Sequence, residues 1–258
     1  MVDKAGNYLV VANYFGGAVE SFPIAKDGTL REAASVVRHT GSSVNKERQE
    51  APHAHGVQLS PDNRFAVAAD LGIDKLMVHR FNAANGVLTP NLAASAKVAA
   101  GAGPRHVAFS PSGRFVYSVN ELNSTVSGFA CDLAKGALRL NQTISTLPKD
   151  YSGENSGAEI DVLPSGKAVY VSNRGHDSIA VFTVDEAKGT LTAAGHVSTR
   201  GKTPRSFAID SSGRYLVVAN QESSNLAVFR IDPKSGLLSP VGPVFKTMSS
   251  PSYVGFAN

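Results

Sequence analysis

The sequence predicts an all-β fold, a β-propeller of five blades with four antiparallel strands in each blade. Three observations lead to this prediction. A unit of about fifty residues occurs five times, four markers keep the same order within each unit, and the segments between the markers have the composition of short strands. Strand-rich repeats of this length are typical of propellers, in which each repeat forms one blade.

The first marker is a turn that ends in glycine or asparagine, at Gly6, Asn63, Gly113, Gly166 and Gly213. Seven residues later comes an asparagine or aspartate, sixteen to eighteen residues later a phenylalanine, and twenty-two or twenty-three residues later a second glycine. We expect the asparagine or aspartate to close the loop after the second strand, because its side chain can bond nearby backbone groups.

The third repeat shows the strand pattern clearly. Residues 106–109, 115–119, 125–129 and 138–144 are rich in valine, isoleucine, phenylalanine and tyrosine, with turn residues between them. No stretch has a 3.6-residue apolar period over three turns. A β-sandwich would not repeat its turn chemistry at fixed offsets, and the strand composition excludes a helical solenoid.

We expect a single domain over residues 1–258. Four blades are predicted at about 52–100, 103–147, 157–200 and 203–248, and the remaining blade combines residues 1–37 with residues 251–258. Residues 253–256 match an innermost strand without following partners, so the C-terminal strand is expected to complete the first blade and hide two sheet edges. Polar insertions at residues 38–51 and 148–157 are long enough to be functional loops.

Composition narrows the classes of function. The chain of 258 residues has a net charge of +4 and no long Lys/Arg block, so no nucleic-acid partner is expected. No apolar run approaches the roughly 18 residues that cross a bilayer, which predicts no membrane partner. The start of the chain lacks the pattern of a signal peptide, and Cys131 is the single cysteine. We therefore expect a cytoplasmic protein, either a monomer or a weak homodimer.

Two repeat positions are expected around one mouth of the central channel, because an innermost strand begins and a second strand ends on the same face. Eight residues before each turn marker stand His55, Arg105, Ala158 and Arg205, and eight residues after it stand Tyr14, Leu71, Glu121, Arg174 and Gln221. Guanidinium groups fit carboxylates and phosphates, so three arginines around one opening predict a small anionic substrate.

The same rings contain candidates for acid–base chemistry. Arginines would hold Glu121 ionised, and we predict that it acts as a general base. Histidine can donate or accept a proton near neutral pH. The predicted catalytic residues are Glu121, Arg105, His55 and His106, and the predicted substrate-binding residues are Arg174, Arg205, Gln221, Glu159 and Asn120. His53 and His55 share one face of a strand, but third and fourth ligands are lacking, so we expect neither a metal nor a cofactor.

Six segments resemble the lactonase-type propeller family, which includes the bacterial propeller 6-phosphogluconolactonase and the fungal carboxy-cis,cis-muconate cyclase. They are PHAH at 52–55, GPRH at 103–106, VNELNS at 119–124, SNR at 172–174, TPR at 203–205 and VANQ at 218–221. The resemblance covers essentially the whole chain. It implies active-site roles for His55, Arg105, Glu121 and Arg174.

Family members have seven blades, whereas this sequence has five repeats. We expect that about two N-terminal blades of the family are missing, or that five blades close into a smaller ring.

The resemblance and the arginines together predict a lactonase that hydrolyses a sugar-acid lactone, with 6-phosphogluconolactone as the expected substrate. In this scheme Glu121 activates water, Arg105 with His55 or His106 stabilises the oxyanion, and Arg174 and Arg205 bind the anionic tail. The alternatives are a carboxymuconate cycloisomerase, which needs similar groups, and a non-catalytic propeller scaffold or truncated relic.

Overall fold

The computed structural model describes residues 1–256, which form five antiparallel sheets. The first sheet contains β1 (Tyr8–Asn13), β2 (Ala18–Pro23) and β3 (Ser35–Arg38). The second contains β4 (Ala54–Leu59), β5 (Phe65–Asp70), β6 (Lys75–Asn82) and β7 (Val87–Pro90), and β8 (Ala96–Lys97) also pairs with β6. Two 3₁₀ turns, η1 (Leu71–Ile73) and η2 (Leu92–Ala94), belong to this part of the chain.

The other three sheets have four strands each, in chain order. The third contains β9 (Pro104–Phe109), β10 (Phe115–Asn120), β11 (Thr125–Asp132) and β12 (Ala137–Ser145). The fourth contains β13 (Ser156–Val162), β14 (Ala168–Arg174), β15 (Ser178–Asp185) and β16 (Thr190–Ser198). The fifth contains β17 (Pro204–Ile209), β18 (Tyr215–Asn220), β19 (Asn225–Ile231) and β20 (Leu238–Lys246). The predicted all-β propeller fold is confirmed.

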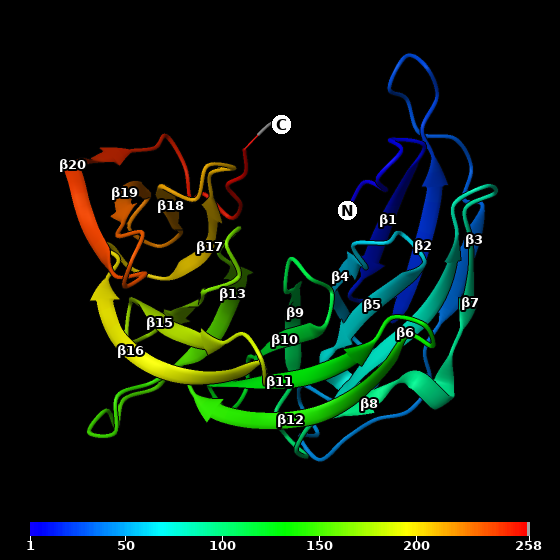
Figure 1. Cartoon of the computed structure of the whole chain (residues 1–258), viewed down its shortest axis with the longest axis horizontal. Coiled ribbons are helices and arrows are strands. Elements are labelled where there is room, and N and C mark those ends of the chain that lie inside the picture. Colours follow the sequence, from blue (N-terminus) through cyan, green and yellow to red (C-terminus); the bar gives the residue numbers. More distant parts are fainter. Residues whose placement is uncertain (257–258) are drawn as a thin grey trace.

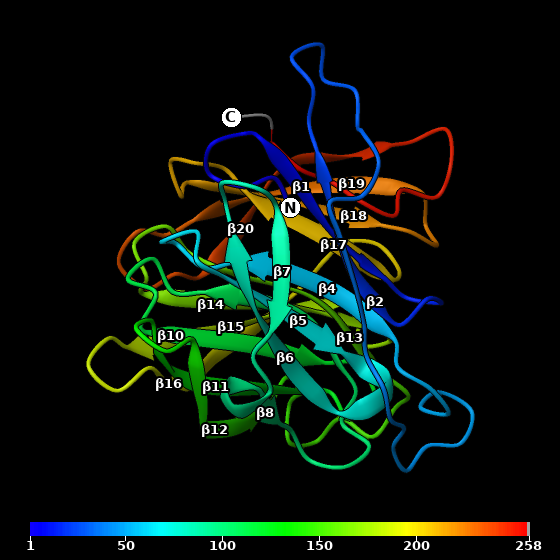
Figure 2. The ribbon, with the colours of Figure 1, turned by 90° about the vertical axis from the view of Figure 1, so that its right-hand side faces the viewer.

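The sheets are arranged along an arc, with β1, β4, β9, β13 and β17 towards its centre and the last strand of each sheet outside (Figure 1). The central strands contact one another in chain order, from β1 with β4 to β13 with β17. The connection between β3 and β4 extends beyond the strand ends at the lower right of Figure 2. No helix within residues 1–256 has the length and apolar character needed to cross a membrane.

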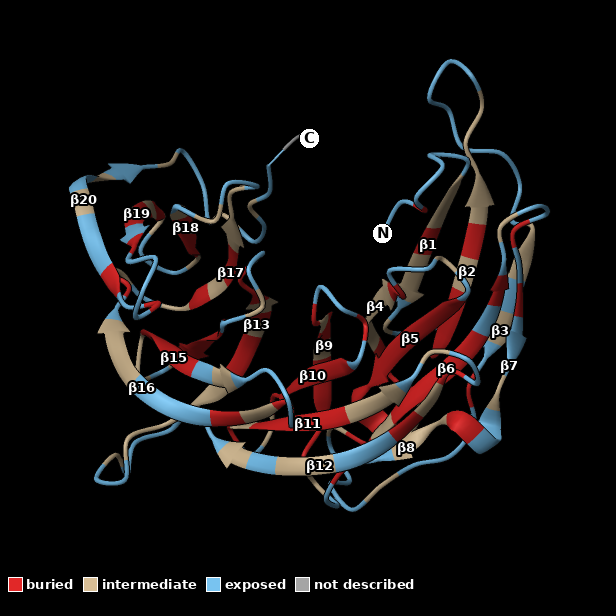
Figure 3. Cartoon of the chain, viewed as in Figure 1, coloured by how far each residue is buried: buried red, intermediate tan, exposed pale blue. Residues whose placement is uncertain are grey.

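The hydrophobic core lies between neighbouring sheets. Every residue of β5 and of β10 is buried, whereas the outer strand β12 has one buried residue and is otherwise half-buried or exposed (Figure 3). One cluster, for example, packs Tyr117 and Val119 of the third sheet against Ile160 and Phe182 of the fourth. Valine, isoleucine and aromatic residues favour such strands because they pack well on a pleated surface.

The repeated asparagine or aspartate closes the loop after the second strand at Asn13 and Asp70, as predicted, whereas at Asn173 and Asn220 it bonds the preceding sheet. Asn13 accepts a hydrogen bond from the Gly16 N–H at 3.0 Å, and Asn173 donates from Nδ2 to the carbonyl of Thr146 at 2.8 Å. Asn220 makes the equivalent bond to the carbonyl of Thr199 at 2.9 Å. The last two bonds tie the second strand of a sheet to the end of the preceding sheet.

The second glycine marker is needed where neighbouring sheets approach each other. Gly189 has a φ of +69°, and a Cβ atom there would lie 2.1 Å from Cδ1 of Phe115 in the preceding sheet. Its carbonyl also accepts a hydrogen bond from the Tyr117 hydroxyl at 3.1 Å. Any side chain at this position would push the two sheets apart.

We predict that Gly189→Ala lowers the free energy of unfolding by about 2–4 kcal/mol, because the left-handed backbone and the overlap with Phe115 both disfavour the native state. Gly28→Ala is the matched control, since Gly28 has the same marker position and a φ of +83° but no atom within 4 Å of the added Cβ. Urea denaturation of both variants measures the difference. Equal losses would show that the contact with Phe115 is unimportant.

The expected completion of the first blade by a C-terminal strand is wrong for residues 251–256, and residues 257–258 of that prediction lie outside the described residues. Residues 251–256 form no strand, and the Val254 N–H donates instead to the Ser206 hydroxyl of β17 at 3.3 Å. Met1 occupies the inner edge of β1, where its backbone exchanges hydrogen bonds of 2.9 and 2.8 Å with Val10. That part of the edge is already paired, so it offers no template for the C-terminal residues.

Candidate active site

The ring positions predicted from the repeat converge on Glu121, which follows β10 and is only 5% exposed. Its Oε2 atom lies 3.0 Å from Arg105 Nε and 3.0 Å from Arg174 Nη2. Its Oε1 atom accepts a hydrogen bond from Arg48 Nη2 at 2.6 Å. One buried carboxylate therefore holds three guanidinium groups, from three different parts of the chain.

A β-bulge explains why the first ring faces this centre. The register between the two innermost strands shifts around His55 in β4, Arg105 in β9 and Arg205 in β17, and around residues 158–159 in β13. A bulge leaves a residue without a partner and re-aims its side chain. The same irregularity, repeated in four sheets, presents each of these side chains at one end of its strand.

Backbone carbonyls of β13 fix two of the arginines. Arg105 Nη1 donates to the carbonyl of Ala158 at 2.6 Å, and Arg174 Nη2 donates to the carbonyl of Gly157 at 3.0 Å. Arg105 Nε is close to Glu121, but its N–H is not aligned for a hydrogen bond. The arginines are therefore oriented by the neighbouring sheet as well as by the carboxylate.

The electrostatics keep Glu121 charged. Burial alone would raise the pKa of this carboxyl, but Arg174, Arg48 and Arg105 outweigh burial and hold the pKa below its usual value. Burial, with the nearby charge of Arg174, lowers the pKa of Arg105 to about 10, so Arg105 is still protonated at neutral pH. Glu121 is thus a stable counter-ion, and this arrangement weighs against its taking up a proton at neutral pH.

A hydrogen-bonded pair of His106 and Glu159 lies beside this cluster. His106 Nδ1 is 2.6 Å from Glu159 Oε1, and His106 Nε2 is 3.3 Å from Arg105 Nη1. The rings of His55 and His106 are 5.2 Å apart. Burial, followed by the charge of Arg105, lowers the pKa of His55 to about 2, so His55 is a neutral imidazole. Its Nδ1 atom is buried without a hydrogen-bond partner among the described residues.

The other predicted residues are placed less uniformly. Arg205 is half-buried. Burial, and to a smaller extent the charge of Arg205, lower the pKa of Arg174. Asn120 is 1% exposed and donates to Thr125 and Ser127 within its own sheet, and its role in binding substrate stays a prediction. Gln221 is half-buried after β18.

Arg48 is the site residue that the repeat analysis missed. It belongs to the polar insertion at residues 38–51, which has no counterpart at a fixed offset in the other repeats. The length and polarity of this insertion indicated a functional loop, but they did not indicate which of its side chains would contact Glu121.

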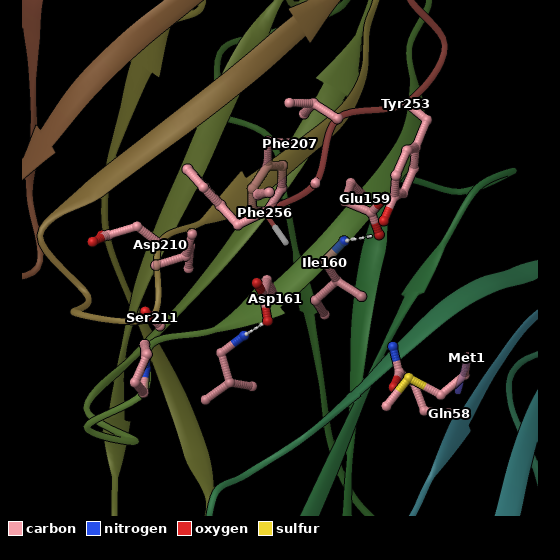
Figure 4. Close-up of a pocket in the computed structure, with 16 residues that line it drawn as sticks. Met1, Gln58, Glu159, Ile160, Asp161, Phe207, Asp210, Ser211, Tyr253 and Phe256 are labelled. Atoms are coloured by element: carbon pink, nitrogen blue, oxygen red, sulfur yellow. Dashed lines mark hydrogen bonds between the residues drawn. The ribbon is translucent and has the colours of Figure 1, made fainter. Parts of the chain in front are cut away.

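A cavity of about 510 Å³ lies next to the site (Figure 4). Glu159 and Asp161 of β13 line it together with Phe207, Tyr253 and Phe256. Burial raises the pKa of Asp161 to about 6, and the charge of Glu159 adds to this effect. Glu159 therefore connects the cavity with the His106 pair and the arginines. Within residues 1–256, no three His, Cys, Asp or Glu side chains are grouped so that they could hold a metal ion.

Comparison with known proteins identifies the family. The sequence profile of the family described as "Lactonase, 7-bladed beta-propeller" matches residues 1–256. The chain belongs to this family. The resemblance inferred from the six segments is confirmed, and the described residues form five sheets of this seven-bladed architecture.

Among curated relatives, the 6-phosphogluconolactonase of Bacillus subtilis is 41% identical over 209 residues. The alignment covers 81% of this chain but only 58% of that protein, so the chain spans less than two thirds of its relative's length. Among solved structures, a protein from Lactobacillus plantarum matches with a TM-score of 0.91 and 34% identity, over 98% of this chain and 72% of that one. The periplasmic gluconolactonase of Pseudomonas aeruginosa matches with a TM-score of 0.86 and 36% identity, over 97% and 70%.

Proposed function

We propose that this protein hydrolyses the lactone of a sugar acid and that 6-phosphogluconolactone is its substrate. The observation that carries the proposal is the group of arginines around Glu121 beside the His106–Glu159 pair. Three guanidinium groups, of Arg48, Arg105 and Arg174, contact the single carboxylate of Glu121, an excess of two positive charges. The names of the Bacillus subtilis and Pseudomonas aeruginosa relatives support the same reaction class.

In the proposed reaction, a water oxygen attacks the lactone carbonyl carbon, the ring C–O bond breaks, and the ring oxygen takes up a proton. Negative charge develops on the carbonyl oxygen during the attack. Arg105, held in place by Glu121 and by the Ala158 carbonyl, supplies N–H donors for this oxyanion. Such a pre-oriented donor contributes about 3–4 kcal/mol of transition-state stabilisation. The neutral His55 imidazole provides a further polar group beside it.

We assign the general base to His106 rather than to Glu121, because His106 Nε2 faces one guanidinium group whereas the Glu121 carboxylate faces three. Glu159 contacts Nδ1 of His106 and thereby orients the imidazole, with its other nitrogen towards Arg105. His106 would take the proton from water and return it to the leaving ring oxygen. Glu121 has both oxygens engaged by arginines, so its assignment as the base stays a prediction that the same experiment tests.

Arg174 and Arg205 remain the proposed residues for the anionic part of the substrate. No metal or cofactor has a part in this scheme. The cytoplasmic location, the monomeric or weakly dimeric state and the role of Gln221 stay predictions from the sequence.

We expect His106→Asn to lower kcat for freshly prepared 6-phosphogluconolactone by about 10²–10⁴-fold, because the proton acceptor is lost. Glu159→Gln should cause a smaller loss, since it removes the partner that orients His106. His176→Asn is the control, because this histidine lies in the turn between β14 and β15 and contacts Tyr151 and His196. Rates are followed in a coupled assay and corrected for spontaneous hydrolysis.

Wild-type protein that hydrolyses no sugar lactone would refute the proposed function. If His106→Asn hydrolyses the lactone as fast as wild type and Glu121→Gln is much slower, Glu121 rather than His106 is the general base. Turnover of a carboxymuconate in place of lactones would favour the cycloisomerase alternative.

A further inference from the structure

Arg48 differs from the other arginines that contact Glu121. Its side chain is 42% exposed, whereas those of Arg105 and Arg174 are 3% and 14% exposed. Arg105 and Arg174 each use a further N–H on a carbonyl of β13. A guanidinium group has five N–H donors, so Arg48 retains donors for a ligand that arrives from solvent.

The segment that carries Arg48 is anchored directly beside it. Gln49 is fully buried, and its Nε2 donates to the carbonyl of Leu71 at 2.8 Å and to Asp74 Oδ1 at 2.8 Å. Its Oε1 accepts from the Asn45 N–H at 3.1 Å, and the Asn45 side chain in turn accepts from the Arg48 N–H at 3.1 Å. These contacts already restrict the backbone at Arg48, so less conformational entropy is lost when the side chain binds a ligand.

Asp74 joins this segment to the strand that carries Arg105. Its Oδ1 atom accepts from the Gly103 N–H at 2.7 Å as well as from Gln49, and its Oδ2 atom accepts from the Ser43 hydroxyl at 2.5 Å. Gly103 directly precedes β9, and its carbonyl accepts from the Glu121 N–H at 2.7 Å. One buried carboxylate therefore sets the positions of Arg48, Arg105 and Glu121 relative to one another.

We propose that Arg48 is the specificity residue that makes this site prefer a phosphorylated lactone, through its exposed N–H groups, while Nη2 stays against Glu121. The inference rests on the proposed lactonase function and adds Arg48 to Arg174 and Arg205 as a residue that binds the anionic part of the substrate. A phosphate dianion would neutralise the excess of two positive charges, which an uncharged lactone would leave in place. Arginine suits this role because its planar fork binds phosphate with two N–H groups.

The test compares two substrates, 6-phosphogluconolactone and unphosphorylated glucono-δ-lactone. We expect Arg48→Gln to raise KM for the phosphorylated lactone at least tenfold more than KM for the unphosphorylated one, which is the scale of one charge-assisted hydrogen bond. Lys46→Gln removes the same charge from an exposed position of the same segment and should leave both KM values unchanged. The proposal is overturned if Arg48→Gln changes KM equally for both lactones. It is also overturned if Arg205→Gln, but not Arg48→Gln, reduces the preference for the phosphorylated lactone.

A binding measurement keeps this inference separate from the proposed reaction. If wild type hydrolyses neither lactone, the proposed function fails, and isothermal titration with 6-phosphogluconate and gluconate still tests Arg48. Wild type should bind 6-phosphogluconate more tightly than gluconate. In Arg48→Gln the ratio of the two dissociation constants should fall at least tenfold. No preference in wild type, or an unchanged preference in Arg48→Gln, contradicts the role of Arg48.

Discussion

Arg105→Ala is expected to lower kcat/KM for 6-phosphogluconolactone by about 10²–10³-fold, because it removes the proposed oxyanion donor from a buried site. Arg105 also contacts Glu121 and lies beside His106, so its loss disturbs both side chains. Steady-state kinetics at saturating and limiting substrate would show whether the loss falls on kcat, as a role in the transition state requires.

Two further variants make this result interpretable. Arg105→Lys keeps the charge but not the planar fork, so it should also lose most of the activity while it changes the melting temperature less. Arg114→Ala is the control, because Arg114 is exposed in the turn before β10, with its Cζ 5.3 Å from the centroid of the Phe115 ring. Activity of Arg105→Ala within threefold of wild type would contradict the proposed oxyanion site.

Glu121→Gln is expected to lower the free energy of unfolding by about 3 kcal/mol at pH 7, since three guanidinium groups would lose their buried counter-ion. The native pKa of Glu121 is lowered from 4.5, so its ionised form stabilises the native state. This contribution is fully present above about pH 4.5 and is lost as pH falls through the native pKa. The difference between wild type and Glu121→Gln should therefore shrink in acid.

Denaturant titrations at pH 7, 5 and 3 measure this dependence. Glu186→Gln, at an exposed turn, serves as the control and should leave stability nearly unchanged at each pH. A Glu121→Gln variant as stable as wild type at pH 7 would show that the arginines do not need this carboxylate. A difference that grows in acid would contradict the lowered pKa.

The repeat alone determined the fold class and the positions of the strands in the third sheet, because local turn chemistry and strand composition recur in every blade. It also placed Arg105, Glu121 and Arg174 around one opening, since equivalent positions of successive blades face the same centre. The conformation of residues 251–256 could not be deduced in this way, because it depends on whether the inner edge of β1 is free, and Met1 already occupies part of it.

The chemistry of the site was decided only by the tertiary structure. The bulges that re-aim His55, Arg105 and Arg205 depend on pairing between strands, and pairing is not a local property of the chain. The Asn120 side chain forms hydrogen bonds within its own sheet. Arg48 belongs to an insertion outside the repeat and contacts Glu121. The three arginines lower the pKa of Glu121 through space, so its character as a counter-ion arises only when segments that are distant in sequence come together.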